Sequence, residues 1–187
     1  MVSINRVVMN PTNRRIIKAL GPQNLEVAEV SGNWGQQFAF KSYDIFRYPA
    51  WDICKGPYRD EQSGEVRRFD LVLANQVWEH LDRPYAATRH VYEMLRDGGY
   101  FWVAVPFFIP FHAAPQDNSR WSARGLKNLL IEAGFDAEAI HADQWGNRHV
   151  ARRNLEDEWP PVYDAEKDNI KNDPMMPICS WALAQKV

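Results

Sequence analysis

Two apolar runs on either side of an amphipathic stretch constrain the fold of this chain more than any other feature. FDLVLA (Phe69 to Ala74) and YFWVAV (Tyr100 to Val105) are nearly continuous apolar segments, typical of strands that are covered on both faces. Between them, residues 83–95 repeat apolar side chains at helical spacing. A strand, a crossover helix and a second strand predict a parallel pair with a right-handed connection.

The remaining pattern extends this unit on both sides. We expect further strands at Leu25 to Val30, Phe135 to Ala142 and Ile178 to Ala184, two short strands and loops within residues 41–68, and helices at residues 10–20 and Trp121 to Ala133. This order predicts an α/β fold with a doubly wound, mostly parallel sheet in a three-layer α/β/α sandwich. The 187 residues fit one domain, 1–187, with a charged surface excursion around 146–176.

Composition argues against several classes of protein. Apolar residues make up 45% and charged residues 25%, as in soluble globular chains, and the net charge of −2 lacks the basic excess of nucleic-acid binders. The longest apolar run, residues 100–111, contains two prolines and is shorter than the roughly 20 residues that span a bilayer. The amino terminus lacks a secretory apolar region, and there are two cysteines, Cys54 and Cys179. We therefore expect a cytoplasmic protein that binds neither nucleic acid nor membrane.

Ligands of a doubly wound sheet bind beyond the carboxyl ends of its strands, and the chain carries distinctive motifs there. They are EVSGNWG (Glu29 to Gly35), FDLVLANQVWEHL (Phe69 to Leu81) and MLRDGGYF (Met94 to Phe101), followed by PFFIPFH, PQDNSRW and GLKNLLIEAGF. In this order, residues 25–143 resemble the class I S-adenosylmethionine-dependent methyltransferases, in particular the type 11 branch. The first motif departs from the family pattern, because Ser31 and Asn33 stand at two glycine positions.

The resemblance implies a Rossmann-like methyltransferase fold, S-adenosylmethionine as cofactor, and a set of cofactor-binding residues. It places Glu29 near the amino-acid tail of the cofactor, with Ser31, Gly32 and Gly35 lining the loop beneath it. Asn75 and Gln76 would face the methionine portion. The ribose would be held by Asp44 or Asp52, although either carboxylate could equally be a solvated loop group.

Two histidines and a polar loop are the candidates for catalysis and acceptor binding. His80 and His112 follow two successive strands and could act as the general base, but His80 could instead be a structural histidine bonded to a loop carbonyl. Asp117, Arg120 and Trp121 lie in a loop that could orient polar groups of the acceptor. The alternative is that Asp117 and Arg120 form a local ion pair that pins this loop.

Other chemistries find less support in the sequence. No pair of the histidines or cysteines has the spacing of a zinc motif, so we expect no metal site. No G-x-S-x-G nucleophile elbow and no G-x-G-x-x-G dinucleotide motif occurs.

The sequence thus predicts a methyltransferase that uses S-adenosylmethionine and acts on a small-molecule or sugar-like acceptor, transferring the methyl group to oxygen. The alternative is a non-catalytic S-adenosylmethionine-binding or regulatory protein whose first motif has degenerated at Ser31 and Asn33. The many aromatic side chains, eight of them Trp, leave a homodimer open.

Overall fold

The computed structural model describes residues 1–113 and 115–187. Its six-stranded sheet has the order β2-β1-β3-β4-β6-β5. The strands are β1 (Glu26–Val30), β2 (Ser42–Phe46), β3 (Phe69–Asn75), β4 (Leu95–Pro106), β5 (Ile140–Trp145) and β6 (Cys179–Gln185). All neighbours from β2 to β4 pair in parallel, and β6 runs antiparallel to both β4 and β5. The mostly parallel sheet predicted from the sequence is confirmed.

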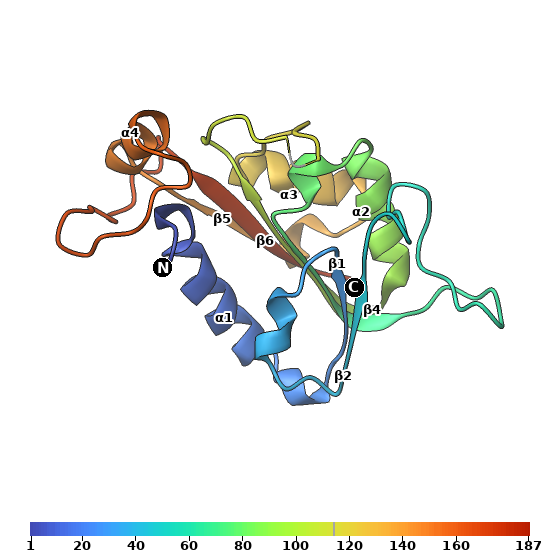
Figure 1. Ribbon diagram of the computed structural model, residues 1–187. Coiled ribbons are helices and arrows are strands. Elements are labelled where there is room, and N and C mark those ends of the chain that lie inside the picture. Colours follow the sequence, from blue (N-terminus) through green and yellow to red (C-terminus); the bar gives the residue numbers. More distant parts are fainter. Residues whose placement is uncertain (114) are drawn as a thin grey trace.

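Helices cover both faces of the sheet, with α1 on one face and α2 and α3 on the other (Figure 1). Their bounds are α1 (Met9–Ala19), α2 (Pro84–Met94), α3 (Ala123–Glu132) and α4 (Arg148–Glu156), and short 3-10 helices occur at Ile4–Arg6, Pro22–Asn24, Trp34–Gln37, Trp78–His80 and Ala137–Ala139. As predicted, Ser122 caps α3 through a hydrogen bond from the Gly125 amide. None of the helices in the described residues combines the length and apolar character needed to cross a bilayer.

Alternation of side chains along the central strands produces two cores. In β3, Val72 and Ala74 belong to the cluster beneath α2 and α3, whereas Leu71 and Leu73 belong to the cluster beneath α1. This alternation explains why the strand reads as continuously apolar, since both of its faces are buried.

Two predicted elements differ from the structure. Residues 41–68 contain one strand, β2, followed by a long loop with a single bridge between Arg59 and Val66. Aromatic packing holds this loop, because Tyr58 stacks on Phe46 with ring centroids 4.0 Å apart. The strand expected at Phe135 to Ala142 begins only at Ile140, because the Asp136 side chain caps a short 3-10 helix before it.

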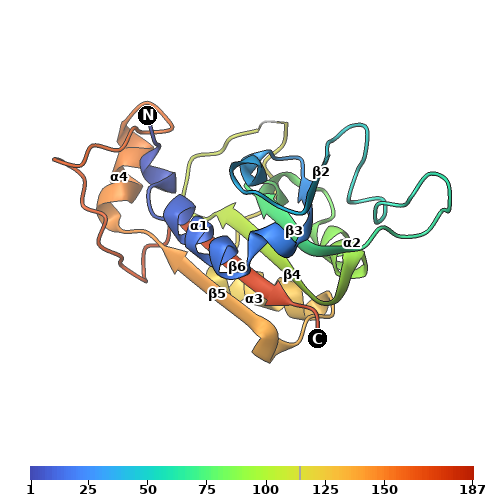
Figure 2. The same ribbon diagram turned by 90° about the horizontal axis from the view of Figure 1, so that it is seen from below.

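The excursion at 146–176 contains a helix and docks on the amino terminus. Asn147 caps α4 by accepting a hydrogen bond from the Val150 amide. Asn5 and Asn154 exchange side-chain hydrogen bonds of 2.8 and 2.9 Å, and Ser3 forms a bridge with Val162. Figure 2 shows α4 next to the first residues of the chain, beyond the end of the sheet. These contacts bring two distant segments to the same edge of the molecule.

Candidate active site

The chain reverses its direction of winding between β1 and β3, and a cavity opens there. From β1 the chain moves outward to β2 and then returns to β3 on the other side of β1. A cavity of about 540 Å³ lies at the carboxyl ends of these strands, lined among others by Ser31, Trp51, Asp52 and Asn75. Its size is within the roughly 300–1,000 Å³ of small-molecule sites, and its position is the usual one in doubly wound sheets.

Glu29 shapes the loop after β1 from inside the protein. Its fully buried carboxylate accepts hydrogen bonds from the amides of Trp34 (2.8 Å) and Gly35 (2.6 Å) and from the Tyr43 hydroxyl. A Cβ on Gly32 would lie 2.0 Å from Glu29 Oε1, so the close approach of loop and carboxylate requires glycine there. Burial and the Glu29 carboxylate also raise the pKa of Tyr43. Among the described residues that line the cavity, Ser31 and Gly32 occur but Glu29 and Gly35 do not.

Two residues adopt left-handed backbone at the ends of the central strands. Ser31, after β1, has φ of 59°, and Gln76, after β3, has φ of 55°. This conformation is unfavourable for residues other than glycine and is enriched at active sites. The structure thus accommodates Ser31, one of the departures from the family motif, at a local energetic cost.

Asn75 carries a side-chain donor without a partner at the wall of the cavity. Its Oδ1 accepts hydrogen bonds from Trp102 Nε1 (2.9 Å) and Asn13 Nδ2 (3.1 Å), which fixes the orientation of the amide. Its buried Nδ2 has no partner in the described structure. An unpartnered buried donor is rare in proteins, and one that borders a cavity is available to a ligand.

The two carboxylates proposed for the ribose are in different places. Asp52 lines the cavity, and its Oδ1 accepts a hydrogen bond from the Cys54 amide at 3.0 Å. Asp44 forms an ion pair with Arg67 at 2.7 Å and is not among the described lining residues. Of the two carboxylates, only Asp52 is in a position to contact a ligand in this cavity.

A second cavity of about 500 Å³ adjoins the first one. Gln76 and His80 line both cavities, and Arg6, His112 and Trp159 contribute to the second. Its walls come from the amino terminus, the loop after β4 and the segment after α4. The two cavities meet at the carboxyl end of β3, where a cofactor and an acceptor could be held side by side.

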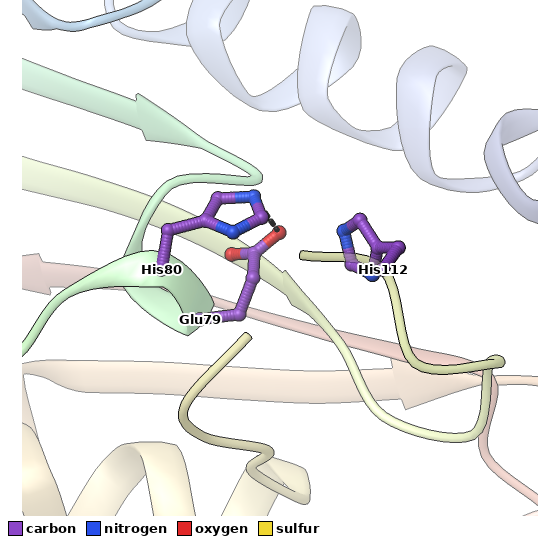
Figure 3. Close-up of side chains that lie close together, drawn as sticks. All are labelled: Glu79, His80 and His112. Carbon is purple, nitrogen blue, oxygen red and sulfur yellow. Dashed lines mark ion pairs between the residues drawn. The ribbon is translucent and has the colours of Figure 1, made fainter. Parts of the chain in front are cut away.

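Glu79, His80 and His112 lie together at this junction. Figure 3 shows the Glu79 carboxylate beside the His80 ring, with the His112 ring facing them from the loop after β4. Glu79 Oε1 is 3.6 Å from His80 Nε2, and the centroids of the two imidazole rings are 5.1 Å apart. Burial raises the pKa of Glu79 to about 8 and lowers the pKa of His112. A neutral imidazole at this position can accept a proton or a cation.

Asp117, Arg120 and Trp121 stabilise the loop that carries His112. Asp117 pairs with the Arg120 guanidinium and accepts a hydrogen bond from the His112 amide at 2.8 Å. The Arg120 hydrogen bonds hold the pKa of Asp117 at about 2. Trp121 packs against the core, and its carbonyl oxygen accepts a hydrogen bond from Ser180 Oγ at 2.6 Å. In the described chain, none of these three residues lines either of the two cavities.

Sequence reasoning did not single out Glu79, Asn13, Trp51, Arg6 or Trp159. Glu79 lies between Trp78 and His80 shortly after a buried strand, but its burial depends on the segments that cover the end of that strand, so the sequence alone does not predict it. Arg6 and Trp159 join the site through contacts between segments more than 150 positions apart, which no local pattern reports.

Comparison with known proteins identifies the family. The family described as "Methyltransferase domain" matches residues 21–140. This range covers more than half of the chain, so the chain belongs to that family, which is close to the type 11 branch expected from the motifs. It is a methyltransferase, and its methyl donor is S-adenosylmethionine. No curated protein sequence matches the chain significantly.

Solved structures share the fold at low sequence identity. A possible histamine N-methyltransferase of Thermotoga maritima has a TM-score of 0.63 at 16% identity, covering 95% of this chain and 89% of that one. The 1,6-didemethyltoxoflavin-N1-methyltransferase of Burkholderia thailandensis has a TM-score of 0.57 at 14% identity, with coverage of 97% and 79%. Phosphoethanolamine N-methyltransferase 2 of Haemonchus contortus has a TM-score of 0.57 at 12% identity, with coverage of 94% and 52%. At these identities the likeness concerns the fold.

Proposed function

We propose that this methyltransferase transfers the methyl group to an oxygen atom of a small polar or sugar-like acceptor. The observation that carries the proposal is the pair of adjoining cavities, which share Gln76 and His80. The cavity between β1 and β3 receives the cofactor, and the cavity beside the amino terminus receives the acceptor. The free cysteines support a cytoplasmic enzyme.

Several features of the first cavity fit S-adenosylmethionine. Trp51 offers an aromatic surface, Asp52 a carboxylate for the ribose hydroxyls, and Asn75 Nδ2 an unused donor. Ser31 and Gly32 bring the loop backbone close to the ligand. S-adenosylmethionine supplies a sulfonium methyl group that is already activated, so the protein contributes mainly by positioning the reactants and excluding water.

Side chains at the junction of the cavities can accept the proton of an acceptor hydroxyl. His80 and His112 both line the acceptor cavity, and burial favours the neutral form of His112. Either neutral imidazole can accept the hydroxyl proton as the oxygen is methylated and release it to solvent. Arg6, an exposed cation at the wall of this cavity, favours an acceptor with an anionic or strongly polar group.

Two measurements test the proposal. Calorimetry with S-adenosylhomocysteine should show one binding site that weakens when Asp52 is replaced by Ala, and no heat would contradict the cofactor assignment. Incubation with tritiated methyl donor and a panel of hydroxyl compounds should yield an O-methylated product. An exclusively N-methylated product would refute the transfer to oxygen.

The strained Ser31 supports a second candidate, a protein that binds the cofactor without turnover. This candidate predicts S-adenosylhomocysteine binding together with no labelled product from any acceptor. The Ser31→Gly variant, which restores the glycine of the family motif, would then bind the cofactor no differently and remain inactive.

A further inference from the structure

We propose that Glu79, His80 and His112 bind one divalent transition-metal ion at the junction of the two cavities. One donor atom from each residue lies within 4.8 Å of the others, without any ion in the described structure. Two imidazoles and one carboxylate form a ligand set that suits Zn²⁺, Co²⁺, Mn²⁺ or Fe²⁺. Metal binding itself is independent of the proposed function, and only the catalytic role of the ion rests on it.

The Glu79 carboxylate is fully buried, and neither of its oxygens has a hydrogen-bond partner in the described residues. A buried carboxylate without partners is costly, and proteins meet this cost with a proton, a paired charge or a coordinated cation. The nearby guanidinium of Arg120 is already neutralised by Asp117, which leaves the carboxylate available to a cation.

The tautomer of His80 also favours metal binding. Its Nδ1 forms a hydrogen bond with the carbonyl oxygen of Gln116. A carbonyl oxygen only accepts, so Nδ1 carries a proton, and in the neutral ring the lone pair is on Nε2, 3.6 Å from Glu79 Oε1. A histidine that donates from one nitrogen to a backbone carbonyl and presents the other to a cation has the usual arrangement of a metal ligand.

Neighbouring side chains hold His112 beside the other two proposed ligands. Its Nδ1 is buried without a hydrogen-bond partner, and Asp117 Oδ2 lies 3.4 Å away. Asp117 also holds the backbone of His112, so this carboxylate fixes the position of the residue. The ring packs between His80 and Trp159, each with a centroid distance of 5.1 Å. The position of the third ligand is therefore well determined by its neighbours.

The distances require only a small contraction on binding. Ligands about 2.1 Å from a tetrahedral metal ion lie roughly 3.4 Å from each other. The 3.6 Å between Glu79 Oε1 and His80 Nε2 is close to this value, and the donor atom of His112 lies within 4.8 Å of both. With three protein ligands, a fourth position stays open toward the acceptor cavity, which both histidines line. With the ion bound, the two imidazoles would act as ligands rather than as bases, and an acceptor hydroxyl at the fourth position would lose its proton to solvent more easily.

Metal titration of the chelator-treated protein tests the inference directly. Addition of Co²⁺ should produce visible d–d absorption that saturates at one equivalent, and Zn²⁺ should displace it. The variants Glu79→Gln and His112→Asn should each weaken Co²⁺ binding at least about 100-fold. The matched control is His141→Asn, because His141 is an exposed histidine on β5 and its loss should leave the titration unchanged.

The outcomes separate this inference from the proposed function. Absence of one-equivalent binding, or equal binding by wild type and both variants, would overturn the metal site even if S-adenosylhomocysteine binds. Metal binding without S-adenosylhomocysteine binding would support the site and contradict the proposed function. If Glu79→Gln fails to fold, as judged by circular dichroism, the His112→Asn titration decides.

Discussion

The two ends of the parallel strands differ in how well their charged and polar groups are paired. At the amino end, Glu26 pairs with Lys41 at 2.8 Å and with Arg96 at 2.6 Å, and Asp70 pairs with Arg96 at 2.8 Å. Asp70 also accepts a hydrogen bond from the Glu26 amide at 2.8 Å. Each carboxylate here has a cationic partner within the folded chain.

At the carboxyl end, Asp117 also pairs with Arg120, but several buried polar groups of the described residues lack partners. Asn75 Nδ2 and both oxygens of Glu79 are buried without hydrogen bonds in the described residues, and Ser31 and Gln76 hold left-handed backbone. This difference indicates that the amino end of the sheet contributes to stability, whereas the carboxyl end keeps polar groups available to ligands. Substitutions at the amino end should therefore affect stability, whereas substitutions at the carboxyl end should also affect activity.

The largest expected effect concerns the two histidines. Replacement of His80 or His112 by Ala should slow methyl transfer by about 10²–10⁴-fold, the usual contribution of a group that assists proton removal. In His112→Ala the affinity for S-adenosylhomocysteine should change little, as calorimetry would show, because His112 is not among the described residues that line the first cavity. His141→Ala is the control and should retain the wild-type rate, whereas full activity of both single variants would remove the histidines from the mechanism.

Asn75→Ala should strongly reduce stability. The substitution leaves Trp102 Nε1 and Asn13 Nδ2 without their acceptor, at about 1–3 kcal/mol for each buried donor. Urea unfolding should show a loss of about 2–4 kcal/mol in the free energy of unfolding. The exposed Asn128 in α3 provides the comparison, and a similar loss in Asn128→Ala would contradict this explanation.

The two ends should also differ in their pH dependence. The pKa of Glu26 is lowered to about 2 by Lys41 and Arg96, so its contribution to stability is present above pH 4.5 and is lost as pH falls toward 2. The pKa of Glu79 is raised to about 8 by burial, so the folded chelator-treated protein binds an extra proton and loses stability as pH rises from about 4.5 to 8.

Urea unfolding of Glu26→Gln and Glu79→Gln between pH 2 and 9 measures both slopes. Glu26→Gln should flatten the acidic part of the curve, and Glu79→Gln should flatten the part between pH 4.5 and 8. Because Glu79 is buried and Glu26 is partly exposed to solvent, the second change should be larger. If both variants keep the wild-type curve, the contrast between the two ends would be wrong.

The smallest expected effect is at Ser31. The Ser31→Gly variant removes the side chain from a residue with φ of 59° and should raise the free energy of unfolding by about 0.5–1 kcal/mol. Gly56→Ala, in the loop after β2 where an added Cβ meets no atom within 4 Å, is a reference for the entropy of the unfolded chain. A loss of stability in Ser31→Gly would mean that the hydroxyl compensates for the backbone strain.

The sequence predicted what depends on local pattern. The buried strands at Phe69 and Tyr100, the helix between them and the Ser122 cap follow from periodicity and capping, and they place the site at the ends of β1 and β3. Residues 41–68 were predicted less well, because Pro and Gly obscure periodicity there and aromatic packing of Trp51 and Tyr58 on Phe46 replaces a strand.

The candidate site was predicted in part. The family resemblance selected Asn75 and Gln76, and strand-end reasoning selected His80 and His112; the structure places all four around the cavities. It could not reveal that the carboxylate of Glu29 is directed into its own loop, since this depends on the loop path after β1. The cluster of Glu79, His80 and His112 was also not predicted, because the sequence has no zinc-motif spacing and the sheet, rather than one motif, brings these residues together.

The first residues of the chain have a practical consequence for experiments. Met1, Val2 and Ser3 form part of the wall of the proposed acceptor cavity, and the Ser3 bridge to Val162 holds them there. Residues fused ahead of Met1 would emerge at the mouth of this cavity and compete with an acceptor. Affinity tags for all assays are therefore better attached after Val187, which follows β6 at the opposite end of the sheet (Figure 1).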